Sequence, residues 1–189
     1  MLAGGRSTRF GRDKLAEPYR GTSLLEHAVS ALAPVCAEVV VVLAPVGPEP
    51  RTPPGVPVRL ARDAVEGQGP LMGLAAGLSG TRTETAVVIG GDMPEPAPGV
   101  LLLMLGRIDD PGVVAVALED GERFRPLPCV LRVGPARDAA AELVGRGERR
   151  LRSLLETLRA AVVLEPTWRA LDPSGRTLFD VDEPGDLET

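Results

Sequence analysis

Short apolar runs alternate with helical patterns along the whole chain. Val39–Leu43 is an uninterrupted apolar run between Pro34 and Pro45, which is typical of a strand buried on both faces. Ala86–Ile89 has the same character and ends at a pair of glycines. Further strands are predicted at residues 56–60, 113–118 and 128–133.

Helical patterns fill the segments between these runs. Ser23 and Glu26 have the spacing of a capping box, which predicts a helix that begins there and ends before Pro34. Pro70 stands at the start of an apolar segment and predicts a short helix over residues 70–78. Three more helices are predicted over residues 100–105, 136–144 and 151–158.

This alternation predicts an α/β fold with three layers, a Rossmann-like, mostly parallel sheet with helices on both faces. With 189 residues, the chain is expected to form a single domain over residues 1–189. In such sheets ligands bind beyond the carboxyl ends of the strands, at the point where the strand order reverses. Polar residues that directly follow strands are therefore the candidates for a functional site.

The first strand raises a question about its length. Met1, Leu2 and Ala3 alone precede Gly4, whereas strands usually have about five or six residues. An unusually short strand and a start upstream of Met1 are both compatible with this pattern, and we favour the second.

The loop after this strand has the composition of an anion-binding loop. Its glycines allow backbone N–H groups to approach an anion closely, and its arginines and lysine supply positive charge. The spacing matches neither the G-x-x-x-x-G-K-[ST] loop nor the G-x-G-x-x-G loop. The loop therefore fits a polyphosphate, with an ordinary glycine-rich turn as the alternative. Its residues are Gly4, Gly5, Arg6, Ser7, Arg9, Gly11 and Lys14.

Asp92 is the second candidate group, and it follows the predicted strand that ends at Ile89. Mg²⁺ prefers hard oxygen ligands and often takes only one or two protein carboxylates. The alternative is an aspartate that only forms the turn before Pro94.

Composition limits the other classes of function. A net charge of -5 argues against general nucleic-acid binding, so an anionic ligand must be met by local charge. Cys36 and Cys129 lie far apart in the sequence and are expected to be reduced, buried thiols. The single His27 is expected to be structural. Neither a membrane span nor a signal peptide is predicted, so we expect a cytoplasmic protein.

Five segments, taken together, resemble a known family. Residues 2–14 resemble the signature L-A-G-G-x-S-x-R-x-G-x-x-K of nucleotidyltransferases, and the chain is most similar to the molybdenum cofactor guanylyltransferase (MobA-like) family. Asp63 with residues 69–74 is similar to its second nucleotide loop. Residues 91–94, 125–128 and 179–187 are similar to its C-D-x-P, Q-P-L-P and F-x-N-x-N-T-P-x-D-L segments, in the family's order.

This resemblance implies a fold of the nucleotide-diphospho-sugar transferase type and a Mg²⁺-dependent transfer of GMP from GTP to molybdopterin, with release of pyrophosphate. It implies that Lys14, helped by Arg9, holds the phosphates and that Asp92 binds the metal, which makes these three the catalytic candidates. The nucleotide-binding residues that it implies are Leu2, Ala3, Gly4, Gly5, Arg6, Ser7, Gly11, Lys14, Asp63, Gly69, Pro70, Leu71, Gly73 and Asp92.

Two acidic positions are given finer roles by the resemblance. The carboxylate of Asp63 would accept bonds from N1–H and the N2 amine of guanine, a base-selective pair of contacts; a loop aspartate without a ligand is the alternative. Asp182 is a candidate second metal ligand beside Asp92. The family usually has Asn at positions 180 and 182, so the carboxylates here would either strengthen metal binding or repel the phosphates.

Other interpretations stay open. A CTP-dependent molybdopterin cytidylyltransferase would share the first loop, and a non-catalytic nucleotide-binding paralogue would explain the departures at Asp180 and Asp182. Expected partners are GTP, the molybdopterin cofactor and proteins that deliver it, with no nucleic acid and no membrane, and the expected state is a monomer. Arginines that could meet an anionic acceptor are Arg123, Arg125, Arg149, Arg150 and Arg152.

Overall fold

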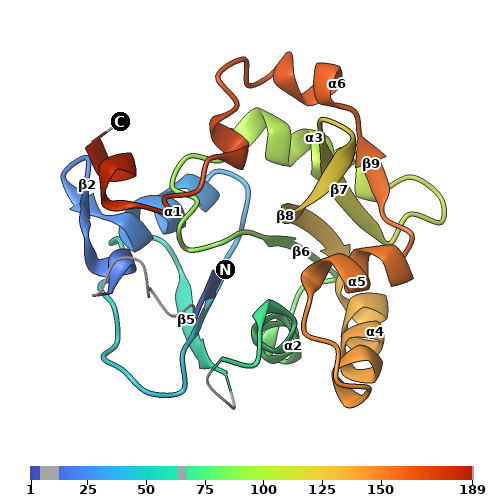
Figure 1. The fold of residues 1–189 in the computed structure, drawn as a ribbon, viewed down its shortest axis with the longest axis horizontal. Helices are drawn as coiled ribbons and strands as arrows, with labels where there is room; N and C mark the ends of the chain where they lie inside the picture. Colours follow the sequence, from blue (N-terminus) through green and yellow to red (C-terminus); the bar gives the residue numbers. More distant parts are fainter. Residues whose placement is uncertain (5–12, 64–66, 189) are drawn as a thin grey trace.

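A sheet in two parts forms the centre of the structure, a computed structural model that describes residues 1–4, 13–63 and 67–188 (Figure 1). The first part has the order β1–β4–β5 and the second the order β6–β8–β7–β9. A parallel bridge between Leu2 and Gly90 joins the two parts. The strands are β1 (Leu2–Ala3), β4 (Val39–Leu43), β5 (Val58–Arg62), β6 (Thr85–Val88), β7 (Ala115–Asp120), β8 (Arg123–Arg132) and β9 (Ala161–Val163).

The mostly parallel sheet is confirmed. β1, β4 and β5 pair in parallel, and so do β7 and β9, whereas β8 is antiparallel to both of its neighbours. The chain passes from β1 to β4 and β5 on one side and returns to β6 on the other. The strand order therefore reverses at β1, which is where sheets of this kind bind ligands.

Helices cover both faces of the sheet, so the three predicted layers are confirmed. Helices α1 (Leu24–Leu32), α3 (Pro98–Ile108) and α6 (Glu165–Arg169) share one apolar core with the sheet. Helices α2 (Pro70–Gly80), α4 (Val133–Gly145) and α5 (Leu151–Thr157) share the other. Within the described ranges, no helix is long and apolar enough to cross a bilayer.

Predicted and observed boundaries differ where tertiary pairing extends an element. β8 begins at Arg123, ahead of the predicted 128–133, because its first half pairs with β7 beyond a bulge between Ala117 and Leu118. The strand predicted at 56–60 lies at Val58–Arg62. The sequence patterns gave no sign of the short elements, which are β2 (Pro18–Tyr19), β3 (Thr22–Ser23), β9, α6, η1 (Lys14–Ala16), η2 (Arg176–Leu178) and η3 (Pro184–Glu188).

The last part of the chain returns to the first. The N–H of Val181 donates to the carbonyl oxygen of Asp92 at 2.9 Å, and Val181 is buried with Tyr19 and Leu24. η3 and the carboxyl terminus consequently lie beside the β2 hairpin (Figure 1). Arg176 forms an ion pair with Glu95, which ties the same segment to the loop after β6. This return places the residues from 180 onwards next to Asp92.

The capping box predicted at the start of α1 is present, so its removal is a test of the fold. Ser23 Oγ accepts from the N–H of Glu26 at 3.2 Å, and Glu26 Oε2 accepts from the N–H of Ser23 at 3.0 Å. We expect Ser23→Ala to cost about 1 kcal/mol of unfolding free energy, or about 2–4 °C in Tm for a chain of this size. Calorimetry measures the change in Tm. Ser30→Ala, on an exposed face of the same helix, is the control, and an equal loss in both variants would contradict the prediction.

Candidate functional site

The candidate residues collect at the carboxyl ends of three parallel strands. Gly4 follows β1, Asp63 follows β5, and Gly90 to Asp92 follow β6. A Cβ at Gly4 would stand 3.3 Å from the backbone nitrogen of Ala44, so the backbone after β1 runs close to the end of β4. Gly4 and Asp92 therefore lie at the same edge of the sheet.

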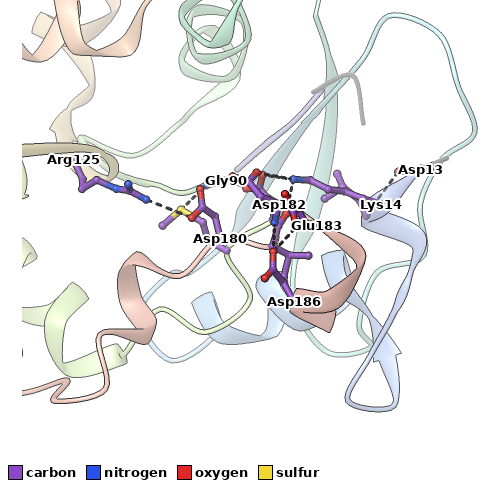
Figure 2. Close-up of polar contacts among 12 residues, drawn as sticks. Asp13, Lys14, Gly90, Arg125, Asp180, Asp182, Glu183 and Asp186 are labelled. Atoms are coloured by element: carbon purple, nitrogen blue, oxygen red, sulfur yellow. Dashed lines mark hydrogen bonds and ion pairs between the residues drawn. The ribbon is translucent and has the colours of Figure 1, made fainter. Parts of the chain in front are cut away.

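Lys14 and Asp92 are in direct contact. Lys14 Nζ donates to Asp92 Oδ2 at 2.8 Å and to the carbonyl oxygen of Val181 at 2.7 Å. Asp182 Oδ1 lies 3.8 Å from the same ammonium (Figure 2). The Lys14 side chain is only 14% exposed, so these contacts largely shield its ammonium from solvent. The structure thus brings together Lys14, Asp92 and Asp182, which were all predicted site residues.

The glycines before Asp92 are required by packing. A Cβ at Gly90 would overlap with Asp92 Oδ1, because the carboxylate folds back over Gly90. A Cβ at Gly91 would stand 3.3 Å from the Leu15 side chain and 3.4 Å from that of Ala3. The N–H of Met93 donates to the carbonyl of Gly90 at 3.3 Å. Asp92 therefore lies in a turn, and its carboxylate contacts Lys14. A turn-forming role and a metal-binding role of this residue are thus compatible.

Asp186 holds the segment that brings Val181 and Asp182 to Lys14. Its Oδ2 accepts from the N–H of Asp182 at 2.9 Å and from that of Glu183 at 2.8 Å. These bonds, with that from Glu183 the stronger influence, hold the pKa of the Asp186 carboxyl below its usual value. Asp186 and the carbonyl of Val181 were not among the predicted site residues. Asp186 lies within the segment that resembles F-x-N-x-N-T-P-x-D-L and could have been found there. A backbone carbonyl gives no signal in a sequence.

Asp180 is paired with Arg125 on β8. Arg125 Nη2 lies 3.4 Å from Asp180 Oδ1, and Nη1 lies 3.8 Å from Asp120 Oδ2. Burial raises the pKa of the Asp180 carboxyl, Arg125 opposes that shift, and the charges of Asp182 and Asp92 add to it. Where the resembled family has Gln and Asn, this chain therefore has a pair of opposite charges in contact. Arg125, expected to meet an anionic acceptor, lies between two carboxylates.

Asp63 lies against the first turn of α2. A Cβ at Gly73 would stand 3.8 Å from Asp63 Oδ2, so the two predicted parts of the second nucleotide loop are adjacent. Asp63 Oδ1 is buried, and among the residues that the structure describes no group donates to it. A buried carboxylate oxygen without a donor is costly. A ligand with N–H groups at this place would remove that cost.

Arg149 is hydrogen-bonded to residues at the start of α2 and just before it. Its carbonyl oxygen accepts from the N–H of Leu71 at 3.1 Å, and its Nε donates to Gln68 Oε1 at 3.1 Å. Arg150 pairs with Glu148, and Arg152 lies over the ring of Phe124 at 4.4 Å. These three guanidinium groups, expected to meet an anionic acceptor, are thus engaged in contacts with the chain itself.

The remaining predicted residues lie in β1, in α2 or outside the described residues. Leu2 and Ala3 form β1, where the N–H of Leu2 donates to Ile89 and its carbonyl accepts from Gly91. Pro70 and Leu71 form the first turn of α2. The others lie outside the described residues: Gly5, Arg6, Ser7, Arg9 and Gly11.

The oxygens around Lys14 suit a hard divalent cation. Within residues 1–4, 13–63 and 67–188, no group of three or more His, Cys, Asp or Glu side chains is arranged to hold a metal ion. Mg²⁺ however needs only one or two carboxylates and completes its shell with phosphate and water. Asp92 and Asp182 already attract one cation, the Lys14 ammonium. The donor set therefore fits Mg²⁺.

Comparisons with known proteins agree on one family. Residues 1–162 match the model described as the MobA-like NTP transferase domain. A protein of Chloroflexus aggregans named "Probable molybdenum cofactor guanylyltransferase" is 35% identical, with 100% of this chain and 90% of that protein covered. A protein of the same name from Mycobacterium bovis is also 35% identical, with 90% of this chain and 85% of that protein covered.

Solved structures share the fold. Molybdopterin-guanine dinucleotide biosynthesis protein A from Archaeoglobus fulgidus matches with a TM-score of 0.76 at 21% identity, over 99% of this chain and 93% of that one. The 2-C-methyl-D-erythritol 4-phosphate cytidylyltransferase from Thermus thermophilus matches with a TM-score of 0.68 at 20% identity, over the same shares. At these identities the likeness extends to the fold alone, and the fold is that of nucleotidyltransferases.

Gly69 is the glycine of the second loop for which both backbone conformation and space exclude a side chain. Its φ is +88°, and a Cβ would stand 2.9 Å from the Cβ and the carbonyl oxygen of Arg149. Gly147 has a φ of +86° but nothing within 4 Å of its Cβ position. We expect Gly147→Ala to cost about 1–2 kcal/mol from conformation alone, and Gly69→Ala to cost more because Arg149 must also move. Urea unfolding compares them, and equal losses would show that the contact with Arg149 does not matter.

Proposed function

This chain belongs to the family of MobA-like NTP transferase domains, and we propose that it transfers GMP from GTP to a molybdopterin-type cofactor and releases pyrophosphate. The observation that carries the proposal is the Lys14–Asp92 contact at the strand end where the sheet order reverses. The names of the relatives that are 35% identical support the choice of substrate.

The reaction is a displacement at phosphorus between anions. A phosphate oxygen of the acceptor attacks the α-phosphorus of GTP, and the bond to the β-phosphate oxygen breaks as pyrophosphate leaves. An acceptor phosphate monoester is already ionised near neutral pH, so the attack needs no strong base. Catalysis then consists of aligning the reactants and neutralising charge as it develops on the leaving group.

We assign the charge-neutralising roles to the cations at this edge. In this proposal Lys14, with Arg9 and the glycine-rich loop, binds the phosphates. Asp92 and Asp182 would hold Mg²⁺, which would withdraw electron density from the phosphate oxygens. Asp180 stays compatible with an anionic substrate because Arg125 offsets its charge.

We assign guanine recognition to Asp63. Its buried Oδ1 has no donor within the described residues, and guanine offers N1–H and the N2 amine side by side. Two bonds from the base to one carboxylate are favourable for guanine and impossible for cytosine, which presents an acceptor at its ring nitrogen.

Two other functions are weighed against this one. A CTP-dependent enzyme is compatible with the fold, because a cytidylyltransferase shares it. The buried Oδ1 of Asp63, to which no group of the described residues donates, favours guanine. A nucleotide-binding protein without activity is compatible with the departures at Asp180 and Asp182. The Lys14–Asp92 pair and the charge that Arg125 supplies to Asp180 favour the enzyme.

Nucleotide choice tests the assignment of Asp63. We expect GTP with Mg²⁺ to raise Tm more than CTP with Mg²⁺, because each bond to the carboxylate contributes about 1.5–3 kcal/mol and a ligand stabilises the fold that binds it. Asp63→Ala should remove the preference for GTP, whereas Asp138→Ala, an exposed change on α4, should keep it. Thermal shifts and titration calorimetry with GTP and with CTP measure the nucleotide preference of each variant. Equal stabilisation by CTP would reject the guanylyl assignment.

Removal of the Asp92 carboxylate tests the transfer itself. We expect Asp92→Ala to lower pyrophosphate release from GTP and acceptor by several orders of magnitude, because the cation loses a ligand and Lys14 loses its partner. The fold should persist, since Asp92 lies in a loop after β6 and the backbone bond from Val181 does not need the side chain. Circular dichroism checks the fold. A variant that keeps more than a tenth of the activity would leave Asp92 as a turn residue only.

A further inference from the structure

Three oxygens surround the ammonium of Lys14, and we call them the oxygen cradle. They are Asp92 Oδ2 at 2.8 Å, the carbonyl oxygen of Val181 at 2.7 Å and Asp182 Oδ1 at 3.8 Å. Figure 2 shows the Lys14 side chain reaching into this group from η1. Two of the three oxygens belong to the residues assigned to the metal, so the ammonium lies where that metal would be bound.

The oxygen cradle is held in place from three sides. The Asp92 carboxylate is folded over Gly90, where a side chain would overlap with it. The N–H of Val181 donates to the carbonyl of Asp92 at 2.9 Å, which fixes the two strand-end segments to each other. Asp186 holds the turn at Asp182 through two backbone N–H groups. These contacts hold the backbone that carries the oxygens in one arrangement around a single cation.

Distance and charge make the two cations incompatible at this place. Mg²⁺ binds oxygen at about 2.0–2.1 Å, so an ion on Asp92 and Val181 would take up the space that the ammonium fills at 2.7–2.8 Å. Like charges so close also repel each other strongly. Lys14 in contrast has a flexible four-carbon stem that can carry its charge to another anion.

We propose that Lys14 and the divalent cation exclude each other from the oxygen cradle, and that the Val181 carbonyl serves the cation as a third ligand. This proposal rests on the proposed function, because the triphosphate supplies the anion to which the Lys14 ammonium moves when the cation enters. Cation and nucleotide then bind with positive coupling, each removing a cost of binding the other. Without nucleotide, Lys14 acts as a counter-ion that prevents the carboxylates from repelling each other.

The sequence adds an independent observation: Lys14 is the only lysine of the chain, and all of its other basic side chains apart from His27 are arginines. An ammonium is a compact charge on a flexible stem, whereas a guanidinium is planar and larger. The exchange needs a group small enough to enter the oxygen cradle and mobile enough to leave it. A single lysine also allows the exchange to be followed with isotope-labelled lysine.

Cation affinity without nucleotide tests the exchange. Mn²⁺ is titrated into the wild-type protein, Lys14→Met and Lys14→Arg, and free Mn²⁺ is measured by its paramagnetic resonance. We expect Lys14→Met to bind Mn²⁺ at least tenfold more tightly than wild type, because the competing ammonium is gone, and Lys14→Arg to show no such gain. Asp182→Asn added to Lys14→Met should reverse the gain. Equal or weaker binding by a folded Lys14→Met protein would overturn the proposal.

A second measurement uses the wild-type protein and so does not depend on the folding of any variant. Lysine labelled with ¹³C at Cε is incorporated during expression, so Lys14 gives the one labelled lysine signal, and this signal is followed by NMR. Millimolar Mg²⁺ alone should shift this signal only with weak, saturable affinity, and GTP should lower the Mg²⁺ concentration needed at least tenfold. A signal that stays in place while Mn²⁺ is shown to bind would overturn the exchange.

The two proposals fail separately. Both measurements work without an acceptor and without turnover, so a protein that shows the exchange but transfers no GMP would reject only the proposed function. A protein that transfers GMP while Lys14→Met gains no affinity for Mn²⁺ would reject only the exchange.

Discussion

The candidate site depends on the pairing of a two-residue strand with both parts of the sheet. β1 pairs with β4 on one side, and on the other the N–H of Leu2 donates to Ile89 while its carbonyl accepts from Gly91. These bonds hold Gly4 beside the loop that carries Asp92. Gly4 and the turn that carries Asp92 are thus neighbours, because two peptide groups of Leu2 join β1 to the end of β6. A change in that register would separate the end of β1 from Asp92.

Charge compensation is the second constraint on this site. The chain has a net charge of -5, and the candidate site brings Asp92, Asp180 and Asp182 towards the place where a triphosphate is proposed to bind. Lys14 lies among the oxygens of Asp92 and Asp182, and Arg125 lies beside Asp180. Carboxylates therefore replace the amides of the resembled family together with a guanidinium that offsets one of them. The aspartate at position 180 thus comes together with Arg125, whose positive charge compensates for the added negative charge.

The patterns of apolar residues predicted the layers because they reflect burial directly. Val39–Leu43 and Ala86–Ile89 are apolar on both faces, and both become central strands. Ser23 and Glu26 set the start of α1 through a local hydrogen-bond pattern that requires no tertiary contact. β2 and β3 could not be predicted in this way, because two-residue strands have no period. The early start of β8 follows from pairing with β7, which is a contact between segments and not a property of either.

The sequence by itself determined the fold class and the order of the main elements, and it indicated the candidate reactive groups, since burial periodicity, caps and glycine-rich loops act over a few residues. Lys14, Asp63 and Asp92 could be selected because each follows or begins a recognisable local pattern. Only the tertiary structure decided which of them meet. It placed the carbonyl of Val181 on Lys14 and Arg125 on Asp180, because these contacts join residues more than fifty positions apart in the chain. Such contacts arise from how the sheet and the returning chain end pack, and a backbone carbonyl carries no side-chain identity that a sequence could reveal.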